Sequence, residues 1–211
     1  MGGPDASLVA GLRRFVREPP PPDREPSADG GPRCELCPIS LAADHKHLLD
    51  LDERRIVCVC PTCWSMRSGE ARYRPTGSRT LWLEDLNLPD DLWAEFQIPI
   101  GLAFFLRSTA SGQVVGLYPS PAGATECELD LAAWDRLVAA NPVLEDLDPD
   151  AEALLVNRMA EPHIHVVAPL DDCYRLVGIV KATWEGISGG AAMEEAVQRY
   201  FDGLRAEAKV R

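Results

Sequence analysis

The sequence CELC at residues 34–37 and the sequence CVCPTC at residues 58–63 hold five of the seven cysteines of this 211-residue chain. Between them stands DHKH at residues 44–47, with two of the four histidines. Two cysteines separated by two residues on a tight turn form half of the ligand set that a tetrahedral Zn²⁺ or Fe²⁺ ion requires. We therefore predict that two such turns face each other across a small hairpin and hold one metal ion through Cys34, Cys37, Cys60 and Cys63.

Three further side chains in this segment exceed what a four-coordinate ion needs. They are Cys58, His45 and His47. Each could substitute for one of the four cysteines, or the three could support a second ion, or each could remain unligated near the metal. The spacing leaves these alternatives open. Arg54 to Val59 reads as a strand, on which we expect Cys58 and Cys60 to point to one side.

The identity of the metal is a separate question. An iron site of the rubredoxin type, Fe(Cys)₄, also uses two CxxC pairs, and Cys60-Pro61-Thr62-Cys63 matches its CPxC pattern. In that family a glycine follows each pair, whereas Pro38 and Trp64 stand there in this chain. Proline has no N–H to offer to sulfur. We predict Zn²⁺, with iron in a tetrathiolate site as the alternative.

The composition divides the chain into four segments. Residues 1–17 read as an amphipathic helix, and residues 18–33 as a Pro/Gly-rich linker. Residues 34–80 form the Cys-rich module, which is too small and polar to hold itself together without metal. Residues 81–211 form an acidic body.

The body reads as an α+β domain of two layers, built from β-hairpins and about three helices. Residues 101–107 and 113–118 predict one hairpin, and residues 153–156 and 163–167 predict a second strand pair. Three helices are predicted from apolar residues at helical spacing, at residues 130–140, 171–184 and 192–206.

The formal net charge of -12 lies in the body, where residues 81–211 carry nine Lys and Arg against 22 Asp and Glu. Such a surface argues against nucleic-acid binding, which depends on basic residues placed against phosphates. No apolar run approaches the roughly 20 residues of a membrane span. No apolar signal segment follows Arg13-Arg14, so we expect a cytoplasmic protein, in which paired cysteines bind metal more often than they form disulfides.

The chain carries no GxSxG, Walker or GxGxxG motif and no convincing pair of nucleophile and base. An HNH nuclease also places Asp-His between two CxxC pairs, but its central Asn and its His after the last cysteine are missing. His163 and His165 read as structural histidines, and Cys127 as inert. We therefore expect a protein that is not an enzyme.

Several motifs together resemble those of an uncharacterised bacterial protein family encoded in nickel-iron hydrogenase gene clusters. They are LRRF (12–15), CELC (34–37) with HKHLLDL (45–51), CVCPTC (58–63), IPIGLAFF (98–105), LYPSPAGATE (117–126) and CYRLVGIVKATWEGISGG (173–190). The resemblance covers nearly the whole chain except the linker. It implies hydrogenase subunits or maturation proteins as partners, and hence an accessory protein or, alternatively, an electron carrier.

Overall fold

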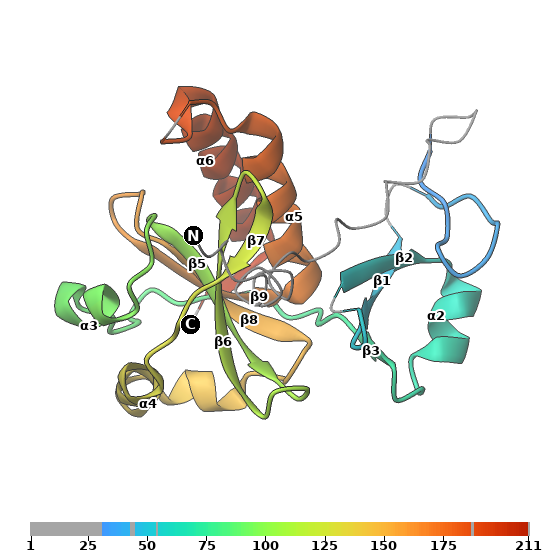
Figure 1. The fold of residues 1–211 in the computed structure, drawn as a ribbon, viewed down its shortest axis with the longest axis horizontal. Coiled ribbons are helices and arrows are strands. Elements are labelled where there is room, and N and C mark those ends of the chain that lie inside the picture. The colour runs from blue at the N-terminus through green and yellow to red at the C-terminus, as the bar shows by residue number, and fades with distance from the viewer. Residues whose placement is uncertain (1–30, 43–44, 54, 187, 211) are drawn as a thin grey trace, which may run out of the picture.

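The computed structural model describes residues 31–42, 45–53, 55–186 and 188–210. A small three-stranded unit lies beside a larger body built on a seven-stranded sheet (Figure 1). The predicted N-terminal helix at residues 1–17 and most of the linker at residues 18–33 lie outside the described residues.

The small unit contains the predicted hairpin. Strands β1 (Lys46–Asp50) and β2 (Arg55–Val59) pair antiparallel, and β3 (Tyr73–Pro75) pairs with the other edge of β1. Helix α2 (Pro61–Arg67) follows β2. One face of the hairpin carries a core of six buried residues: Cys34, Leu48, Val57, Val59, Cys60 and Tyr73. The core of this unit is small, and the contribution of metal to its stability stays a prediction.

Strands of the body form one sheet in the order β10-β4-β9-β8-β5-β6-β7. Their bounds are β4 (Leu81–Trp82), β5 (Leu102–Ser108), β6 (Gln113–Ser120), β7 (Gly123–Glu126), β8 (Glu152–Asn157), β9 (Ile164–Pro169) and β10 (Lys209–Val210). All neighbours pair antiparallel except β10, which lies parallel to β4. Both predicted strand pairs, β5 with β6 and β8 with β9, are confirmed.

The helices of the body are α3 (Asp90–Glu95), α4 (Leu131–Ala140), the 3₁₀ helix η1 (Pro142–Asp146), α5 (Leu170–Thr183) and α6 (Gly190–Glu207). The three longer ones correspond to the three predicted helices. Asp130 caps α4 by accepting the N–H groups of Ala132 and Ala133, as predicted. Helix α6 begins after Gly189, whose φ of 103° suits glycine.

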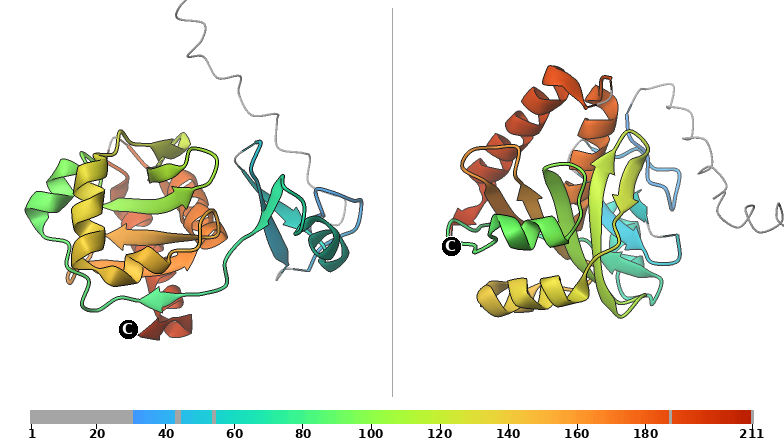
Figure 2. Two further views of the ribbon diagram at one scale, coloured as in Figure 1. Left: turned by 90° about the horizontal axis from the view of Figure 1, so that it is seen from below. Right: turned by 60° about the vertical axis from the view of Figure 1, so that its left-hand side comes forward.

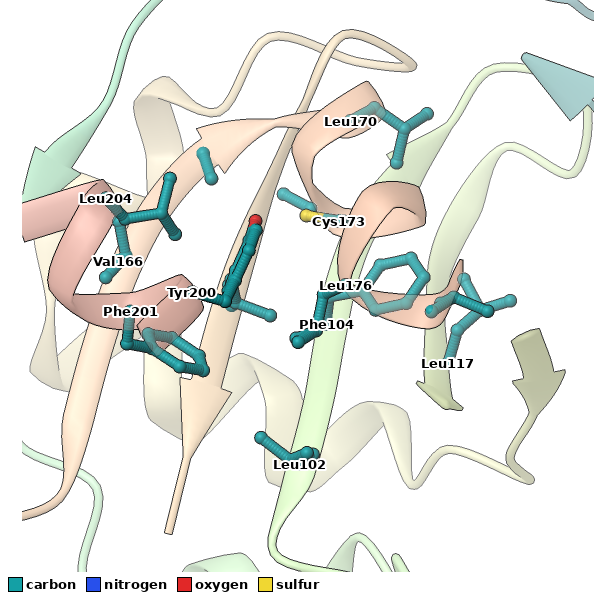
Figure 3. Packing of buried hydrophobic residues seen from close by; sticks show 14 of the residues in the cluster. Leu102, Phe104, Leu117, Val166, Leu170, Cys173, Leu176, Tyr200, Phe201 and Leu204 are labelled. Atoms are coloured by element: carbon teal, nitrogen blue, oxygen red, sulfur yellow. The ribbon is translucent and has the colours of Figure 1, made fainter. Parts of the chain in front are cut away.

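Apolar side chains cover both faces of the central strands. On one face, Leu102 and Phe104 of β5 pack against α5 and α6, with Cys173 and Phe201 among the contacts (Figure 3). On the other face, Ala103 and Phe105 of the same strand pack in a second cluster with α3, α4 and η1. The α+β class is confirmed, but the helices form a layer on each side of the sheet. A continuous apolar run such as that of β5 is typical of a strand buried on both faces.

A connector joins the three-stranded unit to the body (Figure 2), and the two parts also contact each other through side chains. Leu49 and Ile56, on the second face of its hairpin, pack with the α5 side of the body. The connector at residues 76–80 lies against β8, where the N–H of Gly77 donates to the carbonyl of Ala151 at 2.9 Å. A Cβ atom at Gly77 would come within 2.8 Å of Glu152 Cγ, so only glycine allows this close approach. Glu152 in turn accepts from Arg79 at 2.5 and 3.0 Å.

Candidate metal centre

The first cysteine pair lies on a tight loop. An isolated bridge between Arg33 and Ser40 closes the loop, and the N–H of Cys34 donates to the carbonyl of Ile39 at 2.9 Å. Cys34 is 5% exposed, whereas Cys37 is half-buried. The loop thus directs both sulfur atoms toward the hairpin, as the CxxC spacing predicts.

The second pair lies at the start of α2. Cys60 is the N-cap residue, and its sulfur accepts the N–H of Cys63 at 3.4 Å. Pro61 occupies the first helical position, where its missing N–H costs nothing. Because β2 ends at Val59, Cys60 lies beyond the strand, and the expectation that it would share one side of the strand with Cys58 is wrong.

The four sulfur atoms of Cys34, Cys37, Cys60 and Cys63 all lie within 4.8 Å of one another. The Cys37 and Cys60 sulfur atoms are 3.7 Å apart, and each cysteine is a free thiol. Metal–sulfur bonds of about 2.3 Å in a tetrahedron place neighbouring sulfur atoms about 3.8 Å apart. The cluster therefore has the dimensions that a tetrathiolate metal ion needs. Both Zn²⁺ and iron fit these dimensions.

The protonation of the cluster reflects crowding of the sulfur atoms. Burial raises the pKa of Cys34, but hydrogen bonds from the N–H groups of Cys60 and Leu36 outweigh it and lower the pKa to about 7. Burial together with the neighbouring Cys37 and Cys60 thiols raises the pKa of Cys63 to about 12. Four thiolates at this separation repel one another, and a bound cation removes that repulsion.

The three surplus side chains form a group of their own. Ligand atoms of His45, His47 and Cys58 lie within 4.8 Å of one another, and this group shares no residue with the four cysteines. His47 and Cys58 lie directly opposite each other on β1 and β2. Their side chains therefore occupy the same face of the hairpin, with Leu49 and Ile56 and away from the Cys34 and Cys60 core.

Each histidine of this group has one ring nitrogen already bound. Nδ1 of His45 donates to the carbonyl of Ala42 at 2.9 Å, and Nδ1 of His47 donates to the carboxylate of Asp171 at 3.0 Å. Hydrogen bonding to Asp171, and then to Cys58, raises the pKa of His47 to about 9. These contacts fix both rings.

Two further residues of this region were missed by sequence reasoning. Asp171 lies in the first turn of α5, 124 positions from His47, and no spacing rule connects the two. Glu35, inside CELC, accepts the N–H of Cys58 at 2.8 Å and forms an ion pair with Arg55 at 2.5 Å. Glu35 therefore joins the first cysteine loop to β2, but its position between two cysteines gives no signal of that role.

The other residues singled out in the sequence lie in the body. His165 is 8% exposed, whereas the side chain of His163 is 30% exposed and lies 3.5 Å from Glu161. Burial raises the pKa of the Cys127 and Cys173 thiols. A raised pKa makes a thiol less reactive, in agreement with the inert character expected of Cys127.

The chain matches a known protein family. A family model described as "Family of unknown function (DUF5947)" matches residues 33–208, which include the cysteine cluster and nearly all of the body. Neither the curated proteins nor the solved structures contain a match. Among the described residues, no helix has both the length and the apolar character needed to cross a membrane.

Proposed function

The chain belongs to the DUF5947 family, and from this premise we propose that it is a metal-binding accessory protein that acts through protein–protein interaction. Its four cysteines hold Zn²⁺, which stabilises the three-stranded unit as a docking surface. The role is one of binding and not of catalysis. The partners are subunits or maturation proteins of a nickel-iron hydrogenase, as the sequence resemblance implies.

One observation carries the metal-binding part of this proposal. Four sulfur atoms from two separate turns lie within 4.8 Å of one another, although the turns are 22 residues apart in the chain. Hydrophobic burial alone gives no reason to gather four thiols at one point of so small a core. Zinc has no redox chemistry, so in this position it supports structure.

The exposed side of the unit supports a docking role. Helix α2 has no buried residue, and it exposes Met66 by 70%. On the first cysteine loop, Ile39 is 54% exposed. Both apolar side chains lie next to the metal ligands, so the metal would fix the backbone that presents them. Methionine adapts to differently shaped apolar partners, which suits a docking surface.

A second candidate function is electron transfer through iron bound by the same cysteines. Two backbone N–H groups are compatible with it, because those of Cys60 and Cys63 donate to the Cys34 and Cys60 sulfur atoms at 3.3 and 3.4 Å. Such hydrogen bonds to sulfur help to set the reduction potential of iron–sulfur sites. They also stabilise zinc thiolates, so they do not distinguish the two metals.

Metal analysis together with visible absorption distinguishes the two functions. Protein purified from its native host is expected to be colourless and to contain stoichiometric zinc at the four cysteines. Ferric tetrathiolate is coloured, so a coloured protein with stoichiometric iron would reject the zinc proposal. Cys37→Ser should lower the metal content, whereas Cys127→Ser, a change at a cysteine outside the cluster, should not.

Co-purification tests the partner. Tagged hydrogenase subunits are expected to retain the wild-type chain and to retain less of the Cys37→Ser variant. Met66→Ser should weaken the association without loss of metal, because it alters only the exposed face of α2. Absence of association at every stage of assembly, with normal hydrogenase maturation in a deletion strain, would reject the hydrogenase part of the proposal.

A further inference from the structure

The group of His45, His47 and Cys58 contains an unpaired buried atom. Nε2 of His45 is inaccessible to solvent and has no hydrogen-bond partner among the described residues. Because its Nδ1 donates to Ala42, Nε2 of the neutral ring carries the lone pair, which can accept a hydrogen bond or bind a cation. A buried polar group left in this state destabilises the folded protein. The atom therefore points to a missing partner.

Both histidines have the outer contacts that metal-bound histidines use. A ligating histidine donates its second ring nitrogen to a backbone carbonyl or a carboxylate, which fixes the tautomer and orients the ring. His45 has the carbonyl of Ala42, and His47 has the carboxylate of Asp171. Nε2 is the nitrogen that remains in each case. Two imidazole nitrogens and one thiolate suit borderline divalent ions such as Zn²⁺.

We propose that His45, His47 and Cys58 form a second metal site, which binds a divalent transition-metal ion such as Zn²⁺ separately from the four cysteines. The two ligand sets share no residue, and they lie on opposite faces of the β1–β2 hairpin. The second site therefore does not depend on which metal the four cysteines hold, or on the proposed hydrogenase partner.

The surroundings of this site favour an ion that can exchange. His45, His47 and Asp171 line a cleft of about 890 Å³ between the three-stranded unit and the body, with Trp64 and Glu152 on its other walls. Three protein ligands leave one position of a tetrahedral ion open, and the cleft gives water or a small ligand access to it. Closed sites with four protein ligands are structural, whereas open sites exchange ligands.

Titration of the full chain with Zn²⁺ alone, after removal of metal under reducing conditions, tests the proposal. The wild type should bind two equivalents. His45→Gln and Cys58→Ser should each remove one equivalent and leave the other, whereas Cys37→Ser should weaken only the four-cysteine site. Asp171→Asn should weaken the second site about 10–100-fold through loss of the outer contact to His47. His163→Gln, the same change as at His45 but outside both groups, should leave two equivalents.

Nitrogen-15 NMR of the wild type gives a second measurement that needs no variant. On addition of zinc, the Nε2 signals of His45 and His47 should shift as the second equivalent binds. If both imidazole signals stay unchanged throughout the zinc titration, whatever the number of equivalents bound, the second site is overturned. Loss of zinc in Cys37→Ser, with the histidine shifts retained, would support it. A failure of the four-cysteine site alone would affect only the proposed function.

Discussion

Acid should destabilise the body through His165, which is buried in β9 and whose Nε2 has no hydrogen-bond partner in the part of the chain that the structure describes. Burial, and then the positive charges of Arg158 and His163, lower the pKa of His165 to about 4, from 6.5 in the unfolded chain. Above pH 6.5 the side chain is neutral in both states, and the folded state has its full stability. Between pH 6.5 and 4 the unfolded chain binds a proton that the folded protein does not, so the free energy of unfolding falls as the pH falls.

The size of the effect follows from these two values. Each tenfold change in proton affinity corresponds to about 1.4 kcal/mol, so the difference between 6.5 and about 4 corresponds to about 3 kcal/mol. Most of this loss should be complete by pH 4.5. It is a large part of the 5–15 kcal/mol typical of a folded domain.

Urea unfolding followed by tryptophan fluorescence from pH 7.5 to 4.5 measures the loss. Carboxylates also titrate at the acid end, so the quantity to compare is the difference between the wild type and His165→Gln at each pH. The free energy of unfolding of His165→Gln, relative to that of the wild type, should rise by about 2–3 kcal/mol as the pH falls. His163→Gln should keep most of the acid effect, because burial of His165, the largest cause, is unchanged by it. Parallel curves for the wild type and His165→Gln would refute the assignment of the acid effect to His165.

Three further predictions concern single substitutions, each measured by the free energy of unfolding. Arg72→Met should destabilise the fold, because it leaves the carboxylate of Asp50, 1% exposed, without the guanidinium 2.6 Å away. Burial raises the pKa of Asp50, but Arg72 and backbone N–H groups outweigh it and lower the pKa, so the loss should shrink in acid as the carboxyl group takes up a proton. Gly116→Ala should cost about 1–3 kcal/mol, because its Cβ would lie 2.6 Å from the Cys127 sulfur, and an unchanged stability would contradict that contact. Gly178→Ala, in α5 with open space around it, should instead stabilise by about 0.5–1 kcal/mol.

Much of the body could be predicted from local sequence signals. Helix α4 has a capping aspartate at Asp130 and a stop at Asn141-Pro142, and β5 and β6 are β-rich runs around a polar loop. The short strands β4 and β10 gave no such signal, because two residues carry no periodicity. They are strands because β4 pairs with β9 and β10 lies parallel to β4, and each of these partners is distant in the chain. The second helical layer was missed because a strand buried on both faces shows no alternation that would reveal it.

The candidate metal centre divides in the same way. The CxxC spacing was sufficient to group Cys34, Cys37, Cys60 and Cys63, since ligands on one turn are neighbours in the chain. The assignment of Cys58 could not be predicted, because it depends on the residue at which β2 ends and on the face that each side chain takes. The contact between His47 and Asp171 depends on how the three-stranded unit packs against α5, which no local pattern encodes.

Contacts at Gly77 in the connector, between His47 and Asp171, and at the packed side chains of Leu49 and Ile56 hold the three-stranded unit to the body. A unit held by one contact can rotate freely about it, whereas several separated contacts restrict its rotation. A partner that pulls on α2 therefore loads the hairpin and, through Asp171, the beginning of α5. Mechanical strain applied at the cysteine loops would thus reach the helical layer of the body.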